Sequence, residues 1–263
     1  MYHAYWGLSG TPFTEAETQD ALQGSSTHAE ALARLEFLRE SQGGLGLLLG
    51  ASGSGKTAII AEFARWAAKR GDLVVTLAVA GSEEEHLSCQ LTAGFEIEGV
   101  EQPGQLWTRL IDRLEELRLE NRSAVILLDD LDRAALSVLA LAERLLAVPA
   151  APLTVVVSAR PEQAQRIGKR LLERASLRIE LTPWDEEETR HYLEAAVSRA
   201  GRAQPAFSRD AVRRLFELSG GTVRRVNQLA ELALLAGAGQ KAVQIDAGTI
   251  EAIQEELAAL PAR

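Results

Sequence analysis

The stretch from Leu45 to Thr57 constrains the fold of this chain more than any other. It reads LGLLLGASGSGKT, an apolar run followed by a glycine-rich segment that ends in Lys56-Thr57. The spacing satisfies G-x-x-x-x-G-K-[ST] with Gly50 as the first glycine, and the following AIIAEFARWAAKR is typical of a helix. A strand, a glycine-rich loop and a helix in this order predict a loop that wraps around phosphate groups.

The residue types of this phosphate loop, Gly50 to Thr57, explain why it would bind a nucleotide. Glycines let backbone N–H groups approach phosphate oxygens, and the helix N-terminus adds partial positive charge. Lys56 can reach the β- and γ-phosphates, and the Thr57 hydroxyl can ligate Mg²⁺. The alternative, a Gly/Ser-rich turn that ends in Lys-Thr, is disfavoured by the flanking strand and helix. We predict nucleotide-binding residues at Gly50, Ala51, Ser52, Gly53, Ser54, Gly55, Lys56, Thr57 and Ala58.

Strands and helices alternate over the first two thirds of the chain. Apolar runs predict strands at 45–49, 73–80, 124–130, 153–159 and 177–183, with helices at 28–41, 58–70, 83–93, 104–120, 132–148 and 161–174. Because these strand runs are almost continuously apolar, the sheet should be parallel and covered on both faces. The predicted fold is a three-layer α/β phosphate-loop core with a five-stranded parallel sheet.

The pattern changes after Pro183. Four helical segments follow without an intervening strand, and several begin at cap-like residues, Asp185, Ser208 and Thr222. We therefore predict a nucleotide-binding core at 1–183 and a small helical lid at 184–263. The opening segment, 1–24, is rich in aromatic residues and shows no periodic element.

Two acids end the third predicted strand. At the end of a buried strand, Asp129 would face the phosphate loop and hold, through water, the Mg²⁺ ion that Thr57 ligates. Asp130 stands where a hydrolase needs a carboxylate to polarise water, which makes it a candidate catalytic residue. The alternative is that the run Asp-Asp-Leu-Asp only begins a helix.

Composition excludes several other classes of protein. The net charge of −9 argues against broad binding to nucleic acid or to anionic membranes. A single cysteine, Cys89, excludes an internal disulfide, suits a reducing cytoplasm and is expected to be a small buried side chain. No apolar run approaches about 18 residues and the N-terminus lacks the pattern of a signal peptide, so we expect no membrane span. The scattered histidines predict no zinc site.

Several motifs along the chain resemble one family, the ExeA/GspA-type AAA+ ATPases of general secretion, which are related to TniB-like transposition helper ATPases. The start MYHAYWGLSGTPF is similar to the family's opening, and HAEALARLEFL to its His-x-Glu-Ala-Leu helix. ARPE, ERASLRIELTPWDEEET and LSGGTVRRVNQLAELALLAG resemble its later motifs. The resemblance covers nearly the whole chain.

This resemblance implies ATP and Mg²⁺ as cofactors, an ATP-dependent homo-oligomer, and roles for further residues. Arg224 matches the lid arginine that reaches the γ-phosphate, with Asn227 after it, and Arg160 or Ser158 matches the polar sensor residue. Arg174 and Arg178 match the region that supplies an arginine finger to a neighbouring subunit. Pro12 and Phe13 would line the adenine. Read from the residues alone, the arginines could be solvated helix faces and the aromatic residues core packing.

The chain departs from the family pattern at its second acid. The family usually has Asp-Glu-Ala-Gln where this chain has Asp-Asp-Leu-Asp. Asp130 is one methylene shorter than Glu, and because a misplacement of about 1 Å can cost roughly 10²-fold in rate, hydrolysis could be slow. Val223 replaces the Pro before the lid arginine, and Ala159-Arg160 replaces Gly-Gln. The acids and the Ser-x-Arg segment also resemble signalling NTPases of the STAND class.

Three functions follow from the sequence. The first is an ATP-binding and ATP-hydrolysing AAA+ module that couples nucleotide state to oligomer assembly or to an unidentified protein partner. The second is a DNA-associated transposition helper ATPase, which the acidic charge disfavours. The third is a slowly hydrolysing signalling switch that acts through protein binding.

Overall fold

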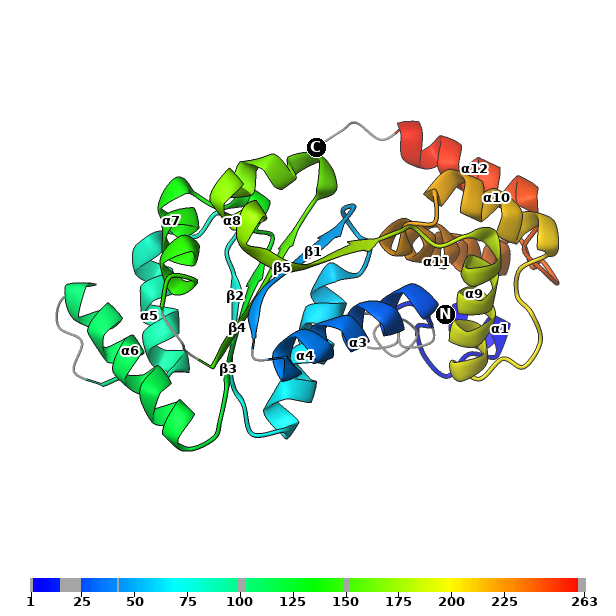
Figure 1. The fold of residues 1–263 in the computed structure, drawn as a ribbon. Coiled ribbons are helices and arrows are strands. Elements are labelled where there is room, and N and C mark those ends of the chain that lie inside the picture. Colours follow the sequence, from blue (N-terminus) through cyan, green and yellow to red (C-terminus); the bar gives the residue numbers. More distant parts are fainter. Residues whose placement is uncertain (1, 15–24, 42, 99–102, 149–151, 260–263) are drawn as a thin grey trace. The chain divides into compact units, whose positions relative to one another are not determined.

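A computed structural model describes residues 2–14, 25–41, 43–98, 103–148 and 152–259 of the chain (Figure 1). The contacts between residues divide the chain into two compact units. The core unit comprises Glu30–Ala51 and Lys56–Leu181, and the helical unit comprises Met1–Ala29, Ser52–Gly55 and Thr182–Arg263. The domain limits inferred from the sequence, 1–183 and 184–263, stay a prediction.

Within the described residues, the core unit contains one sheet of five parallel strands in the order β2-β3-β4-β1-β5. The strands are β1 (Gly44–Gly50), β2 (Leu73–Ala78), β3 (Ala124–Asp129), β4 (Leu153–Ala159) and β5 (Ala175–Leu181). The predicted fold class is confirmed. The fifth strand begins at Ala175 instead of Leu177, because its first residues pair with β1.

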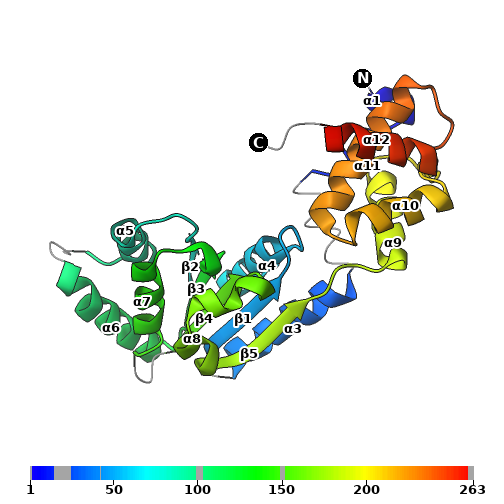
Figure 2. The same cartoon turned by 90° about the horizontal axis from the view of Figure 1, so that it is seen from above.

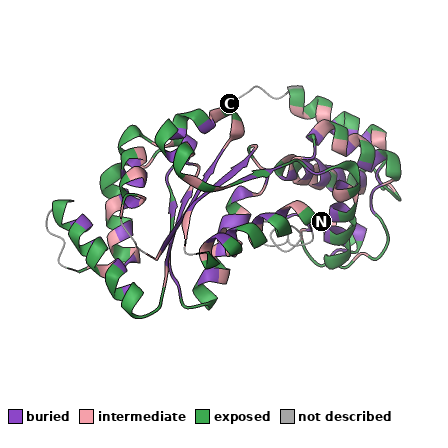
Figure 3. Ribbon diagram, in the orientation of Figure 1, coloured by how far each residue is buried: buried purple, intermediate pink, exposed green. Residues whose placement is uncertain are grey.

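Helices cover both faces of this sheet, as the apolar strands predict (Figures 1 and 3). One face packs on α3 (Ser26–Glu40) and α4 (Lys56–Lys69), where Leu48 of β1 meets Leu35 and Phe63 in one buried cluster. The other face packs on α5 (Glu84–Gly94), α6 (Pro103–Leu119), α7 (Leu136–Leu145) and α8 (Lys169–Arg174). Alternate residues of β1 therefore enter different layers of the core.

The strand order decides where polar residues gather. Strand β4 lies between β1 and β3, and it pairs with both in parallel. All strands of a parallel sheet end at the same edge, so the phosphate loop after β1 and the acids after β3 share that edge with the end of β4.

The helical unit is built on α1 (Tyr2–Trp6), α9 (Glu186–Arg199), α10 (Arg209–Ser219), α11 (Val223–Gly239) and α12 (Ala247–Ala259) (Figure 2). Trp6 is buried, and its indole N–H donates to the Leu234 carbonyl at 2.7 Å. A side chain at Gly237 would place its Cβ 2.9 Å from the Trp6 ring, so the glycine makes room for it. Helix α1 corrects our reading of 1–24 as lacking a periodic element, since packing of Trp6 stabilises a short helix there; residues 15–24 lie outside the described residues.

Two of the predicted caps are confirmed by hydrogen bonds. Asp185 forms a capping box with Glu188, and the Ser208 hydroxyl accepts from the Ala211 amide. Thr222 occupies the N-cap position of α11, but its side chain caps no amide of the described residues.

Two predicted helices are interrupted. The segment 161–174 consists of the 3₁₀ helix η2 (Pro161–Ile167) and α8, separated by Gly168, whose φ of +96° is incompatible with a continuous helix. The segment 132–148 consists of the 3₁₀ helix η1 (Leu131–Arg133) and α7, because Ala134 and Ala135 adopt extended backbone between them.

The environment of Cys89 differs from the prediction. It lies on the exposed side of α5 instead of being buried, while Leu87 and Leu91 of the same helix face the core. Among the helices of the described residues, none combines the length and the apolar composition that crossing a membrane requires.

The central position of β1 predicts a large effect of truncating its core side chains. Leu48 is fully buried, so Leu48→Ala should lower the free energy of unfolding by about 2–5 kcal/mol. Leu119→Ala is the control, because Leu119 is 75% exposed and its loss should change stability by less than about 0.5 kcal/mol. Urea unfolding followed by far-UV circular dichroism measures both. Equal effects would contradict this account of the core.

Candidate nucleotide-binding site

The phosphate loop follows the buried end of β1 at Gly50 and leads into the first residue of α4, Lys56. Its backbone turns at Gly53 (φ +81°) and Gly55 (φ +98°), conformations that side chains with a Cβ rarely adopt. The tip of the loop, Ser52–Gly55, belongs to the helical unit, whereas its two ends belong to the core unit. The spacing read from the sequence thus corresponds to a strand, a loop and a helix.

The Lys56 side chain is held at the base of this loop. It is 6% exposed, and its ammonium group donates to the carbonyls of Gly50 and Ala51 at 2.8 and 3.1 Å. Burial lowers the pKa of Lys56, while the negative charges of Asp130, Asp129 and Asp132 act in the opposite direction. The Lys56 cation therefore lies near three acids and at the N-terminus of α4, a position that favours the binding of a phosphate group.

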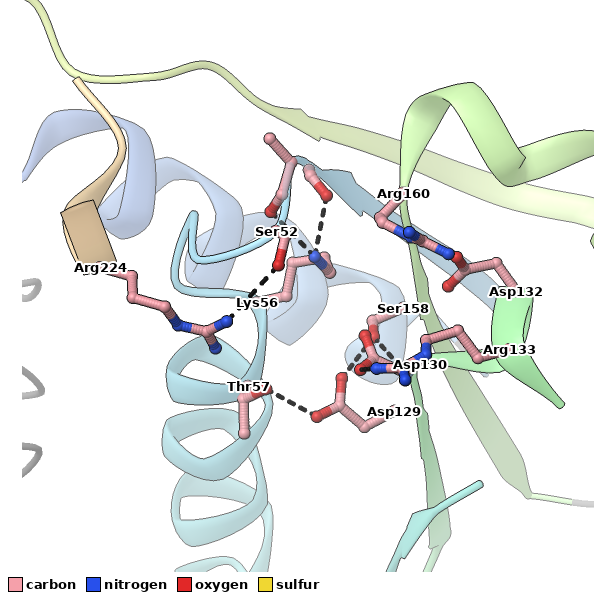
Figure 4. A network of polar contacts seen from close by, with 12 residues as sticks. Ser52, Lys56, Thr57, Asp129, Asp130, Asp132, Arg133, Ser158, Arg160 and Arg224 are labelled. Carbon is pink, nitrogen blue, oxygen red and sulfur yellow. Dashed lines mark hydrogen bonds and ion pairs between the residues drawn. The ribbon is translucent and has the colours of Figure 1, made fainter. Parts of the chain in front are cut away.

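The carboxylate of Asp129 joins elements of the core unit that are distant in sequence (Figure 4). Thr57 Oγ1 donates to Asp129 Oδ2 at 2.7 Å, and Ser158 Oγ donates to Asp129 Oδ1. Thr57 lies in the first turn of α4, Asp129 ends β3, and Ser158 lies in β4. The structure therefore brings the two predicted metal ligands, Thr57 and Asp129, into direct contact.

The predicted catalytic acid, Asp130, has an uncommon backbone conformation. Its φ of 59° and ψ of 43° are left-handed, which Asp tolerates better than most residues. Its backbone N–H donates to Ser158 Oγ at 2.9 Å, and its carboxylate lies 3.9 Å from Arg133 Nη1. Its side chain is 38% exposed, so the carboxylate is accessible to solvent.

Asp132 is a neighbour that the sequence did not single out. It is buried in η1, and its Oδ2 accepts from Arg160 Nε at 2.7 Å. The hydrogen bond to Asp132 raises the pKa of Arg160 further. The predicted sensor Arg160 is therefore bound by Asp132 in this structure. The run of acids after β3 is the sequence signal that could have indicated an acidic partner for this arginine.

The donor set of the core unit fits Mg²⁺. The hydroxyl of Thr57 and the carboxylate of Asp129 are hard oxygen ligands, the kind that Mg²⁺ prefers, and they already lie 2.7 Å apart. Thr57 follows the phosphate loop and Asp129 ends β3, so both lie at the sheet edge that carries this loop. A phosphate anion bound there would supply further oxygen ligands.

In the helical unit, Arg224 contacts the tip of the phosphate loop (Figure 4). Its backbone N–H donates to the Gly53 carbonyl at 3.2 Å, and its Nη1 lies 3.5 Å from Ser52 Oγ. A Cβ at Gly53 would lie 2.6 Å from Arg224 Cβ. Gly53 is therefore required both by its own φ angle and by the approach of Arg224.

Other residues of the helical unit that the sequence singled out make contacts within that unit, and the adenine-lining role of Pro12 and Phe13 stays a prediction. Asn227 accepts a hydrogen bond from the Tyr192 hydroxyl. Pro12 and Phe13 are both buried, and the Phe13 ring lies 6.1 Å from that of Tyr192. His28, which the sequence left without a role, is buried beside the carbonyl of Ser54 in the phosphate loop.

The two candidate finger arginines have partners of their own in the core unit. Arg174 Nη2 donates to the Leu146 carbonyl at 2.6 Å. Arg178 lies on the edge strand β5, is 62% exposed, and lies 3.9 Å from Glu180. Their role toward a neighbouring subunit stays a prediction.

Comparison with known proteins agrees with this geometry. The family model described as an AAA domain matches residues 39–167, which run from the end of α3 through the phosphate loop, β3 and β4 to η2. General secretion pathway protein A of Aeromonas hydrophila is 27% identical over 269 aligned positions, which cover 99% of this chain. The alignment covers 49% of that protein, so the chain spans about half the length of this relative.

Solved structures show a similar fold. The Aeropyrum pernix ORC1 protein in complex with DNA is 18% identical with a TM-score of 0.65, and the match covers 94% of this chain and 68% of that one. The Drosophila ORC bound to DNA is 20% identical with a TM-score of 0.64, and the match covers 92% of this chain and 65% of that one. The Thermotoga maritima RuvB Holliday junction branch migration motor is 16% identical with a TM-score of 0.60. That match covers 88% of this chain and 68% of the other.

The matches agree with one another and with the expectation drawn from the motifs. The AAA model covers the segment in which the phosphate loop, Asp129 and Ser158 lie, and the solved structures share the arrangement of the sheet and helices. Residues 39–167 of the chain therefore match an AAA domain, and the chain is a distant homologue of General secretion pathway protein A.

Proposed function

We propose that this protein binds ATP together with Mg²⁺ and hydrolyses it, and that its nucleotide state controls assembly with other copies of the chain or with a protein partner. The observation that carries the proposal is the contact of Thr57 with Asp129 beside the phosphate loop that holds Lys56. A cytoplasmic location and the finger role of Arg174 or Arg178 are parts of this proposal.

The residues would divide the work by their chemistry. The loop amides and Lys56 would bind the phosphates, and Thr57 and Asp129 would hold the metal ion, which neutralises phosphate charge when bound. Arg224 contacts Ser52 and Gly53, which supports a role for its guanidinium in binding an anion held by the loop. Asp130 would accept a proton from the attacking water, and Ser158 fixes the Asp130 backbone N–H.

The proposed rate of ATP hydrolysis depends on the position of the Asp130 carboxylate. The left-handed backbone of Asp130 is held by Ser158, and Arg133 lies beside its carboxylate. Both features restrict how far this short carboxylate can reach toward a water molecule. We infer slow hydrolysis for this reason.

Two other functions remain as candidates. The relatives named as complexes with DNA favour a DNA-associated ATPase, whereas the net charge of −9 opposes it. The restrained Asp130 favours a signalling switch that retains its nucleotide. Stimulation of turnover by duplex DNA would support the former, and retained nucleotide with negligible turnover would support the latter.

Removing the buried cation should weaken ATP binding. Because hydrogen bonds from a charged donor contribute about 1.5–3 kcal/mol, Lys56→Ala should raise the Kd for ATP by about 10- to 100-fold. Lys69→Ala is the matched control, since Lys69 lies exposed at the other end of α4. Titration with a fluorescent ATP analogue measures both. Unchanged affinity in the Lys56 variant would argue against the phosphate loop as the binding site.

The metal ligands give a separate prediction. Chelation of Mg²⁺ by EDTA should weaken ATP binding to the wild type, and Thr57→Ala should reduce this difference because one of two protein ligands is gone. Thr57→Ser retains the hydroxyl and should behave like the wild type. Binding isotherms with and without EDTA provide the measurement, and an identical EDTA effect in all three proteins would refute the assignment of Thr57.

The length of the acid at 130 can be tested by turnover. Asp130→Glu should raise kcat, by up to about 100-fold if the shorter carboxylate misplaces the water by about 1 Å. Asp130→Asn should lower kcat by about 10²- to 10⁴-fold while leaving the Kd for ATP nearly unchanged. A phosphate-release assay measures kcat for the three proteins. Fast wild-type hydrolysis that the Glu variant does not improve would sink the proposal of slow turnover.

A further inference from the structure

His28 makes a buried contact with the phosphate loop that neither the motif nor the AAA fold explains. It lies in the first turn of α3 and is 4% exposed. Its Nε2 lies 3.1 Å from the carbonyl oxygen of Ser54, and both residues belong to the helical unit. Their positions differ by 26 residues, so the contact is a feature of the tertiary fold.

The chemistry of this contact determines which ring nitrogen carries the proton. A carbonyl oxygen can only accept a hydrogen bond, so Nε2 must be the donor. Burial lowers the pKa of His28, which favours the neutral ring with its single proton on Nε2. Trp184 restrains the plane of the His28 ring, because the two rings pack edge to face with their centroids 6.3 Å apart. Trp184 is itself held by a hydrogen bond from its Nε1 to Ser25 Oγ.

Planarity of the peptide bond carries the effect into the loop. In a trans peptide the C=O of one residue and the N–H of the next point in opposite directions, and the peptide bonds of the described residues are all trans. A hydrogen bond that holds the Ser54 carbonyl therefore directs the Gly55 N–H away from His28. Gly55, with φ of +98°, belongs to the glycine-rich part of the loop, whose amides face the anion in a phosphate-binding loop.

We propose that His28 is a positioning residue of the phosphate loop: its Nε2–H holds the Ser54 carbonyl, so that the Gly55 N–H points at the bound phosphate. This inference rests on the proposed binding of ATP. It assigns a role in phosphate binding to a residue outside the loop and distant from it in sequence.

A pair of substitutions separates the hydrogen bond from packing. In His28→Gln the amide nitrogen takes the place of Nε2 and can still donate, whereas His28→Met has a similar length and no donor. We expect the Met variant to bind ATP about tenfold more weakly and the Gln variant to stay within about threefold of the wild type. His28→Asn, whose amide reaches only the place of Nδ1, should resemble the Met variant.

Fluorescent ATP-analogue titration gives the affinities, and competition by inorganic pyrophosphate tests the phosphate part without the base. The Met variant should lose affinity for both ligands, and circular dichroism of each nucleotide-free protein verifies folding. If the Asn variant fails to fold, the comparison of Gln with Met still decides. Equal affinities of the wild type and the Met variant would overturn the inference, as would an equal loss in folded Gln and Met variants. A wild type that binds neither ligand would instead overturn the proposed function, and this inference with it.

Discussion

The double hydrogen bond of Asp129 is the interaction on which the core of the site depends. One carboxylate accepts from Thr57 of α4 and from Ser158 of β4, and these residues come from segments that the sheet brings to one edge. The parallel pairing of β4 with both β1 and β3 makes this arrangement possible. Since Ser158 also accepts from the Asp130 backbone, the same hydroxyl links the proposed metal ligand Asp129 to the candidate catalytic acid.

The charges in this region balance one another over short distances. Lys56 is buried close to three acids, and two of these acids lie beside arginines of their own, Asp130 beside Arg133 and Asp132 beside Arg160. A buried charge is tolerated only where opposite charges and hydrogen bonds offset its lost hydration. The acids after β3 therefore help to keep the Lys56 charge inside the fold, whereas Arg160 after β4 acts against it.

Much of the fold could be predicted because its signals are local. Apolar runs identify the strands, and the G-x-x-x-x-G-K-T spacing identifies the loop that joins β1 to α4. Asp129 and Asp130 are recognisable because they directly follow the apolar run of β3. The break at Gly168 was missed because apolar periodicity continues across it, whereas the φ angle of one glycine ends the helix.

The contacts that join distant segments could not be predicted. Nothing in the spacing of His28 and Ser54, or of Asp132 and Arg160, indicates that these residues touch. Such contacts depend on how helices pack and on the strand order, and a single sequence records neither directly.

The ion pair of Asp132 and Arg160 has an evolutionary consequence. Asp132 is almost completely buried, and among the described residues its Oδ1 has no hydrogen-bond partner, so its charge depends on Arg160. Replacing Arg160 alone would leave the buried Asp132 carboxylate without its partner, whereas Arg160, whose side chain is 31% exposed, can be hydrated if Asp132 is lost. Across homologues, an aspartate at position 132 should therefore occur together with the arginine at position 160, and a neutral residue should replace it where the arginine is absent.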